Sequence, residues 1–479
     1  MKISEIFNLN VSQYELDFID IDPDKDTRLF VDPGFIRNRK DALSIESLES
    51  IESFFSFFLN LLKSNDKEAR VLFNYLHEPN ETCLGLSKGK PRGNAIGNKD
   101  SDKLFKAIKQ NPTVVNSNID RIEDLLLFVD GIGPDKISDM TTNIIRKNLW
   151  EYTKKQCQLW DIPLKNNIET NYCWDNVDKK WIKYKGDSLV IDKKRILLVP
   201  KNFVSICKNY TPNGLYNEFI LTFLQDDNIK KKSPLVQHRK DKTPFVTKIS
   251  LKRNGSKYSK DFISQFVIKY PDVFYKFKQW ADNNAAKSNW GIIDEASIAS
   301  NDIMNVISSI KNRLIECLSS DDCDDLYRKV VLGALELLFY PDIVHPEFNR
   351  NIVKRNEPST IFDNVATEGF FYNLVHKYKI IRKVECISFP KKTNKKEIDR
   401  LFDEISVDNK VPVLLVFKGI DDVEPVLTRC KDTFIKTGSI VFPLTTDDLS
   451  VMLDNIVDEK SSPYDKFFVA RLNKIVSYK

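Results

Sequence analysis

The chain has 479 residues, of which 42% are apolar and 29% are charged. This length exceeds what one hydrophobic core usually serves, so we expect two or three domains with sizeable cores. Lysine and arginine number 73 against 68 aspartates and glutamates, and the net charge of +5 is too small to indicate nucleic-acid binding by itself. Partners must therefore be inferred from local patches.

The cysteines and the hydropathy pattern argue against zinc-binding, secreted disulfide-linked and membrane-spanning proteins. The eight cysteines form no CxxC pair and no compact grouping with histidine, which argues against a structural zinc site. Scattered thiols in a long chain suit a reducing compartment better than a secreted disulfide framework. No uninterrupted apolar run reaches the roughly 18 residues that span a bilayer, and Met1–Glu5 leads into no apolar signal core. We expect a cytoplasmic protein with no membrane partner.

Two short strands and a helix are predicted near the start of the chain. Residues 14–33 alternate apolar and acidic side chains, which predicts a strand, a polar turn and a second short strand. The Asp-Pro-Asp-Lys-Asp run at 22–26 is either that solvated turn or a group of carboxylates for a divalent ion. Between residues 45 and 62 the apolar positions recur at helical spacing, which predicts an amphipathic helix with a phenylalanine-rich core face.

A glycine-rich basic segment follows at residues 78–97. Lys88, Lys90 and Arg92 lie among four glycines, and the backbone N–H groups of such a loop can hold a phosphate together with the cations. The segment lacks the GxxxxGK[ST] pattern of a P-loop. A basic loop without a ligand is the alternative interpretation.

The densest polar group of the N-terminal half surrounds a Gly-Ile-Gly-Pro turn at 131–134, which leads into a helix predicted at about 138–157. The turn would deliver Asp135 and Asp139 to the start of that helix, where exposed N–H groups favour negative charge. Asp130, Thr141 and Asn143 complete the group. Two interpretations of this group stay open: it caps the helix, or it forms a second functional site.

The composition changes after a small β-rich section predicted at 174–200 from its alternating aromatic and β-branched residues. Residues 230–260 carry eleven lysines and arginines against the single acid Asp241. A groove built from these cations would neutralise several phosphates of DNA, whereas a solvated linker is the competing interpretation. The candidate nucleic-acid-binding residues are Lys230, Lys231, Lys232, Arg239, Lys240, Lys252 and Arg253.

His345 is one of only four histidines, and it lies between Asp342 and Glu347. The segment is bounded by prolines, so we expect a loop there; the alternative is a metal site in which the two acids are ligands.

The C-terminal part alternates helical and strand patterns. Helical spacing covers 303–315 and 326–338. The pattern after residue 385 predicts helix 395–405, strand 411–417, helix 422–434, strand 439–442 and helix 447–457. Such alternation is typical of an α/β sheet with helices on its faces, and the continuously apolar run Val413–Phe417 is expected to be a central strand.

Four short motifs stand in a particular order within residues 362–401. They are Phe-Asp-Asn-Val-Ala at 362–366, Glu-Gly-Phe-Phe at 368–371, Val-Glu-Cys at 384–386 and Glu-Ile-Asp-Arg-Leu at 397–401. In order and spacing they resemble a bacterial branch of the PD-(D/E)XK nuclease superfamily, over roughly residues 330–460. The resemblance implies a restriction-endonuclease-like α/β fold, a DNA substrate, a role in bacterial defence against foreign DNA and a possible protein partner subunit.

The resemblance also implies a Mg²⁺ site for phosphodiester hydrolysis. In such a core an Asp and a Glu hold the ion, and an adjacent Lys helps to place the attacking water. Glu385 occupies the acidic position, whereas Ile387 stands where the family has Lys, and Ser359 or Thr360 where it has Asp. The open replacements are Glu357 or Asp363 as the second acid and Lys391 or Lys392 as the base.

We therefore expect an α/β protein in four sections. These are an N-terminal α+β domain (1–165), a β-rich section and basic linker (166–260), a helical scaffold (261–330) and a restriction-endonuclease-like α/β domain (331–479). The leading hypothesis is a DNA-associated protein with Mg²⁺-dependent hydrolysis, in which Glu385 and Asp363 hold the metal. The alternative is a catalytically inactive nuclease-fold protein that binds DNA or assembles a complex.

Overall fold

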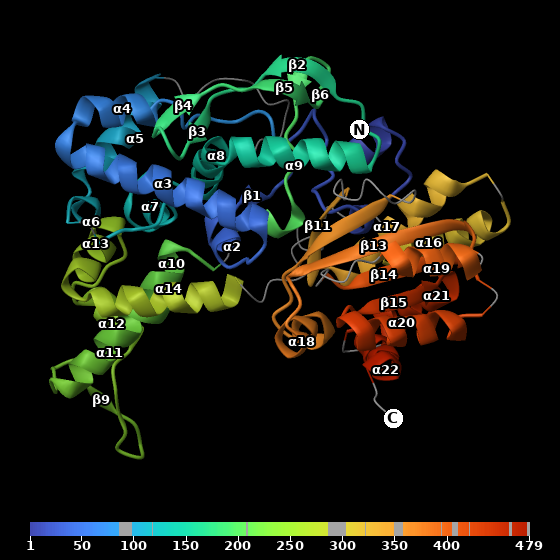
Figure 1. Ribbon diagram of the computed structural model, residues 1–479. Helices are drawn as coiled ribbons and strands as arrows, with labels where there is room; N and C mark the ends of the chain where they lie inside the picture. The colour runs from blue at the N-terminus through green and yellow to red at the C-terminus, as the bar shows by residue number, and fades with distance from the viewer. Residues whose placement is uncertain are drawn as a thin grey trace.

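The computed structural model describes residues 1–85, 98–116, 118–206, 209–285, 303–320, 322–348, 358–393, 395–404, 411–420, 422–458 and 462–476. Figure 1 shows a largely helical N-terminal part with small β-hairpins, a group of helices in the middle of the chain, and a C-terminal part built around a larger sheet. Among the described residues, none of the helices combines the length and apolar character needed to cross a bilayer.

The N-terminal part is organised around one long helix, α3 (Ala42–Ser64). Asp41 caps its start, because its carboxylate accepts a hydrogen bond from the backbone N–H of Ser44 at 2.7 Å. The core face carries Phe54, Phe55 and Phe58, as the helical spacing predicts. The other helices here are α1 (Ile3–Ile6), α2 (Pro33–Arg37), α4 (Asp66–Phe73), α5 (Asn98–Gln110), α6 (Pro112–Val115), α7 (Asp124–Phe128), α8 (Pro134–Ile144) and α9 (Arg146–Leu159).

The single helix predicted at about 138–157 is two helices, α8 and α9, which meet at Ile145. Arg146, at the start of α9, is buried and pairs with Glu81 at 2.7 Å, and it donates a hydrogen bond to Asn143 at 2.6 Å. These bonds fix the chain at the break, and periodicity alone does not reveal such a long-range anchor.

Short hairpins confirm the predicted β-rich section. β3 (Cys173–Asp175) pairs with β4 (Lys180–Ile182), and Trp174 and Trp181 pack on Phe54 of α3. The strand, turn and strand expected over 14–33 are mostly a 3₁₀ turn and extended chain, ending in a two-residue strand. The remaining short strands are β1 (Phe30–Val31), β2 (Lys165–Glu169), β5 (Lys185–Ser188), β6 (Val190–Ile191), β7 (Lys194–Arg195) and β8 (Val204–Ser205).

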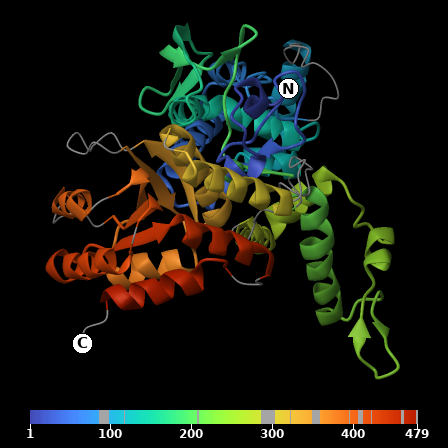
Figure 2. The ribbon, with the colours of Figure 1, turned by 90° about the vertical axis from the view of Figure 1, so that its right-hand side faces the viewer.

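A projecting unit follows, which we call the basic arm: residues 221–253, comprising α11 (Leu221–Lys230), the hairpin of β9 (Gln237–His238) and β10 (Pro244–Phe245), and α12 (Lys248–Arg253). Val246 and Leu251 are buried, and α12 packs against α11. Figure 2 shows the arm standing away from the rest of the molecule. Its neighbours along the chain are α10 (Pro212–Gly214), a π-helical segment (Leu215–Ile220), α13 (Lys260–Lys269) and α14 (Pro271–Ala285).

The C-terminal part contains a five-stranded mixed sheet of order β11-β12-β13-β14-β15. The first three strands pair antiparallel, and β13, β14 and β15 pair parallel. The strands are β11 (Ile343–Phe348), β12 (Ser359–Asn364), β13 (Lys383–Lys392), β14 (Val413–Gly419) and β15 (Val441–Thr445). The predicted α/β alternation is confirmed, with β14 inside the sheet and completely buried over Val413–Phe417.

Helices cover this sheet as parallel strands require. α17 packs against β13, α16 and α21 against β14, and α20 against β15. The helices are α16 (Ile303–Leu318), α17 (Asp324–Phe339), α18 (Gly369–Tyr378), α19 (Lys395–Glu404), α20 (Glu424–Thr437), α21 (Thr446–Asp458) and α22 (Asp465–Val476).

The N-terminal part and the sheet share one continuous core. Buried apolar side chains from Ile3 to Ile475 form a single cluster, and α9 packs directly on β11. Close contact also occurs at Gly333 of α17, where an added Cβ would lie 2.9 Å from Oε1 of Glu15. The edge strand β11 is thereby held against the N-terminal part, which brings residues far apart in the sequence together. The four expected section boundaries stay predictions.

Candidate functional site at the contact of the N-terminal part with the sheet

Glu385, the acid implied by the nuclease resemblance, is a buried residue of β13. The Ser359 hydroxyl donates a hydrogen bond to its Oε1 at 2.7 Å. Ile387, two residues along the strand, is completely buried and lies opposite Ser359 in the sheet. A hydroxyl and an apolar side chain therefore stand where the expected site needs a carboxylate and a lysine. Glu357 lies outside the described residues.

Lys391 does not approach Glu385. It stands six residues further along β13, about 20 Å away at ordinary strand spacing. Its exposed amine pairs with Asp324 at 3.2 Å, and Lys392 follows it at the end of the same strand. The structure thus separates the proposed base from the proposed acid.

Asp363 is committed to other partners. It lies in β12 directly opposite Lys383, whose amine is 2.9 Å from its Oδ1. Its Oδ2 lies 3.7 Å from Nδ1 of His345. Because Glu385 and Asp363 engage different groups, this pair does not fit the expected Mg²⁺ site.

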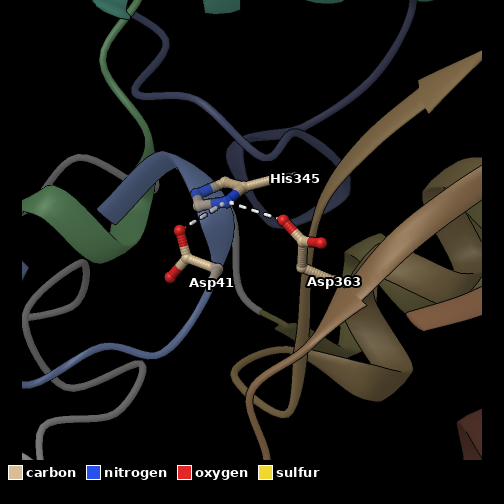
Figure 3. A group of neighbouring side chains, drawn as sticks. All are labelled: Asp41, His345 and Asp363. Atoms are coloured by element: carbon tan, nitrogen blue, oxygen red, sulfur yellow. Dashed lines mark ion pairs between the residues drawn. The ribbon is translucent and has the colours of Figure 1, made fainter. Parts of the chain in front are cut away.

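A compact group forms instead from Asp41, His345 and Asp363, which Figure 3 shows with the imidazole between the two carboxylates. The Nδ1 atom lies 3.2 Å from Oδ1 of Asp41 and 3.7 Å from Oδ2 of Asp363. One donor atom from each residue lies within 4.8 Å of the others, and all three residues are buried. Asp41 comes from the start of α3, His345 from β11 and Asp363 from β12.

The expectation of a loop at His345 was wrong. The residue belongs to β11, which tolerates Pro346 because an edge strand leaves one row of N–H groups unpaired. The register of β11 against β12 shifts between Val344 and Glu347, and His345 has a φ of 54°. This left-handed conformation is uncommon outside glycine, and it turns the imidazole away from the regular strand position.

Several polar groups hold the imidazole in place. Its Nε2 lies 3.1 Å from Oδ1 of Asn202, and the backbone N–H of His345 donates to Oδ1 of Asp17 at 3.1 Å. The other oxygen of Asp17 accepts a 2.6 Å hydrogen bond from the Tyr152 hydroxyl of α9. The imidazole is thus fixed by residues of the N-terminal part, although it belongs to the C-terminal sheet.

The three groups shift one another's pKa values. Burial alone would raise the pKa of Asp41, but the charge and close approach of His345 and the hydrogen bonds from Ser44 lower it to about 2. Burial alone would also raise the pKa of Asp363, but its contacts with His345 and Lys383 lower it below the ordinary value. Burial lowers the pKa of His345, but the charges of Asp41 and Asp17 raise it well above its ordinary value. The neighbouring carboxylates therefore favour the charged form of the imidazole.

A cavity of about 380 Å³ adjoins this group. His345, Asp363 and Lys383 line it from the sheet, and Glu46 of α3 and Lys147 of α9 line it from the N-terminal part. A second cavity, of about 180 Å³, lies between α17 and the sheet and is lined by Thr360 and Cys386 among others. Of these two cavities, the larger one gives solvent and small ligands access to the Asp41–His345–Asp363 group.

The polar group predicted in the N-terminal half is rearranged. Asp135 and Asp139 approach Asp26 and Glu78, and burial followed by the charges of these acids raises the pKa of Asp139 to about 8. Asp130 is not among the acids that shift that pKa.

The side chains of Thr141 and Asn143 stabilise the fold through hydrogen bonds to backbone carbonyls. The Thr141 hydroxyl donates to the carbonyl of Ile137, and the Asn143 amide donates to the carbonyls of His77 and Asp139. Of the glycine-rich basic segment at 78–97, residues 86–97, which include Lys88, Lys90 and Arg92, lie outside the described residues.

All seven predicted nucleic-acid-binding cations are exposed, and all lie in the basic arm. Lys231 pairs with Asp227 at 2.7 Å, and Lys252 donates to Asn217 at 3.1 Å. Arg239 stands at the hairpin tip with its guanidinium 5.6 Å from the ring centre of Phe245. The basic segment is therefore a folded, projecting hairpin and helix pair rather than an extended linker.

Comparisons with known proteins cover only the N-terminal part. A family model described as a domain of unknown function (DUF8370) matches residues 8–211, somewhat less than half of the chain. The match includes Asp41, Asp17 and Asn202, and it ends before His345 and Asp363. No curated protein and no solved structure matches the chain significantly.

Asp41 is the site residue that the sequence did not reveal. Its local pattern, Asp41 followed three residues later by Ser44 at the start of an amphipathic helix, indicates a helix cap, and it does cap α3. The signal for a second role lies only in its three-dimensional contact with His345.

Proposed function

We propose that this protein binds nucleic acid through the basic arm. The observation that carries the proposal is the placement of seven exposed cations on one projecting unit, from Lys230 to Arg253. Nucleic-acid affinity depends mainly on cations that neutralise backbone phosphates, and a hairpin that stands clear of the body can reach a groove or a backbone without steric hindrance. Within the described residues, Lys232 and Lys240 have no acidic partner, so their charge is available to a phosphate.

The C-terminal sheet supports the second half of the proposal, that the protein carries a nuclease-like scaffold that acts by binding rather than by hydrolysis at Glu385. Its three antiparallel strands followed by two parallel ones agree with the resemblance drawn from the motifs at 362–401. Ser359, Ile387 and the distant Lys391 argue against phosphodiester hydrolysis at Glu385. A role in bacterial defence, with DNA or a partner subunit on this scaffold, stays a prediction from the resemblance.

Salt-dependent binding tests the proposal. The affinity of purified protein for labelled double-stranded DNA, single-stranded DNA and RNA would be measured by fluorescence anisotropy across a salt series. Replacing Lys230, Lys231, Lys232, Arg239 and Lys240 with glutamine should weaken binding. On duplex DNA it should also reduce the slope of log affinity against log salt by roughly 0.9 for each phosphate that the arm no longer neutralises.

A matched variant controls for net charge. It replaces five exposed lysines elsewhere, Lys67, Lys106, Lys193, Lys377 and Lys436. This variant should bind like the wild type, because the charges it removes lie outside the arm. An equal loss of affinity in both variants, or an unchanged slope in the arm variant, would refute the assignment of the arm.

A cleavage assay separates binding from catalysis. The same nucleic acids would be incubated with Mg²⁺ or Mn²⁺ and either the wild type or Glu385→Gln, which keeps an oxygen to accept the Ser359 hydrogen bond. We expect no cleavage that depends on Glu385. Cleavage abolished by Glu385→Gln in a folded protein would overturn the binding-only assignment and establish a rebuilt hydrolytic site.

A further inference from the structure

We infer that Asp41, His345 and Asp363 form a binding site for one divalent transition-metal ion, held between helix α3 and strands β11 and β12. The distances between the candidate ligand atoms support this site. Ligand atoms around an ion with bonds of roughly 2.0–2.2 Å lie about 3–3.5 Å from one another. Nδ1 of His345 is 3.2 Å from Asp41 Oδ1 and 3.7 Å from Asp363 Oδ2, so small shifts of the side chains would place all three on one ion.

The imidazole supplies a second, independent observation. The His345 side chain is only 6% exposed, and its Nδ1 faces both carboxylates without a well-formed hydrogen bond to either. The Asp41 oxygen at 3.2 Å is poorly aligned with the N–H, and the Asp363 oxygen at 3.7 Å is too distant. Its other nitrogen, Nε2, contacts the Asn202 carbonyl oxygen at 3.1 Å. A metal-binding histidine commonly donates its second N–H to such an oxygen, which fixes the ring and leaves the first nitrogen as the ligand.

Each carboxylate retains capacity for an ion. Lys383 contacts Oδ1 of Asp363, which leaves Oδ2 facing the imidazole. Oδ1 of Asp41 accepts from the Ser44 N–H, and a carboxylate oxygen has a second lone pair for a metal. Binding replaces the Nδ1 proton with the ion, and the proton is released to solvent.

The donor set identifies the class of metal. One imidazole nitrogen with two carboxylate oxygens suits Mn²⁺, Fe²⁺, Co²⁺ or Zn²⁺, whereas Mg²⁺ and Ca²⁺ favour all-oxygen sites. His345 and Asp363 also line the cavity of about 380 Å³, which provides room for water or a small anion on the remaining coordination positions. The ion would also tie the N-terminal part to the sheet, because its ligands come from both.

Cobalt provides a direct readout with the full-length protein. After treatment with a chelator and desalting, the protein would be titrated with Co²⁺ while its visible absorption is followed, with parallel Mn²⁺ titrations by electron paramagnetic resonance. We expect one Co²⁺ per chain with nitrogen and oxygen ligands, and no displacement by a tenfold excess of Mg²⁺. A thiolate-to-cobalt charge-transfer band as the only signal would place the ion on cysteines and overturn the proposal.

Conservative variants assign the ligands. Asp363→Asn and His345→Asn should each weaken Co²⁺ binding at least tenfold; asparagine is chosen at 345 because it tolerates a positive φ. Asp41→Asn should do the same while keeping an oxygen for the α3 cap, so it serves as ligand test if another variant fails to fold. The matched control is Glu46→Gln, which alters an exposed carboxylate of α3 that lines the same cavity.

The variants decide the outcome. Loss of binding in folded ligand variants, with wild-type binding in Glu46→Gln, supports the site. No Co²⁺ binding by the wild type, or equal binding by wild type and all three ligand variants, overturns it. Circular dichroism in the presence of chelator establishes that each variant is folded before its titration is interpreted.

Discussion

Ionisation of Asp139 is expected to make the stability of the folded protein fall as pH rises from about 4 to 8. Asp139 lies in α8, and burial followed by the charges of Asp135, Glu78 and Asp26 raises its pKa from 3.8 to about 8. An acid with a higher pKa in the folded state holds its proton more tightly there. Its effect on stability is therefore absent below the unfolded pKa near 3.9, grows as pH rises, and is complete above the folded pKa.

The size of this loss follows from the two pKa values. The difference between 3.8 and about 8 corresponds to roughly 6 kcal/mol, at about 1.4 kcal/mol for each tenfold change in proton affinity. Burial and the charge of Asp26 also raise the pKa values of Asp135 and Glu78, so these carboxyls influence one another's titration. This mutual influence, together with partial access of solvent, reduces the expected destabilisation from the single carboxyl to roughly 2–4 kcal/mol at pH 8.5.

Asp139→Asn tests this reasoning, because an amide of the same shape cannot ionise. The thermal midpoints of wild type and variant would be measured by circular dichroism from pH 4 to 9. We expect the variant to be more stable above pH 8, with the two curves converging near pH 4. Asp130→Asn, at an exposed position, is the matched control and should follow the wild type. Parallel curves for Asp139→Asn and wild type between pH 5 and 9 would refute the proposed coupling of these carboxyls.

Two further changes test contacts that hold the sheet and its neighbours. Lys201→Met should destabilise the protein by about 3–5 kcal/mol, because it leaves the fully buried Glu336 without the amine at 3.3 Å. In a denaturation experiment, the double variant with Glu336→Leu should recover most of this loss. Additive losses of stability in the double variant would contradict the reasoning. Ser359→Ala should cost roughly 1.5–3 kcal/mol because it removes the hydrogen bond to Glu385, and an unchanged thermal midpoint would show that this bond contributes little.

Elements with strong local patterns were predictable from the sequence. The phenylalanine-rich helix α3, the helices α16 and α17 and the apolar strand β14 lie close to their predicted bounds, since periodicity and burial determine them locally. The break between α8 and α9 was missed because Arg146 is anchored by Glu81, a partner from a distant segment. His345 was assigned to a loop because flanking prolines mimic one, and only the sheet order shows that β11 is an edge strand.

Of the two candidate sites, one had a clear signal in the local sequence and the other only a partial signal. The cluster of cations was predictable, because eleven lysines and arginines within residues 230–260 are a local compositional signal, whereas their folding into a projecting hairpin and helix was not. Asp363 was among the candidate metal ligands, but its partners were not identified, since the sequence favoured Glu385 from the same pair of strands. The actual neighbours, Asp41 and His345, come from a helix cap and a bulged edge strand. The helix cap gives no sign of a ligand, and the segment at His345 suggested a metal site only with Asp342 and Glu347 as its acids.

The two proposals concern separate parts of the molecule, which makes them independent. The Asp41–His345–Asp363 group requires contact between the part matched by the family model and the C-terminal sheet, because each part supplies some of the ligands. A fragment ending at residue 211 would keep Asp41, Asp17 and Asn202 and lack both other ligands. The basic arm lies beyond that match and contributes no residue to the group. Neutralising the arm should therefore leave metal binding intact, and removing a ligand should leave the salt dependence of nucleic-acid binding intact. A coupled loss would show instead that the ion and the arm serve one site.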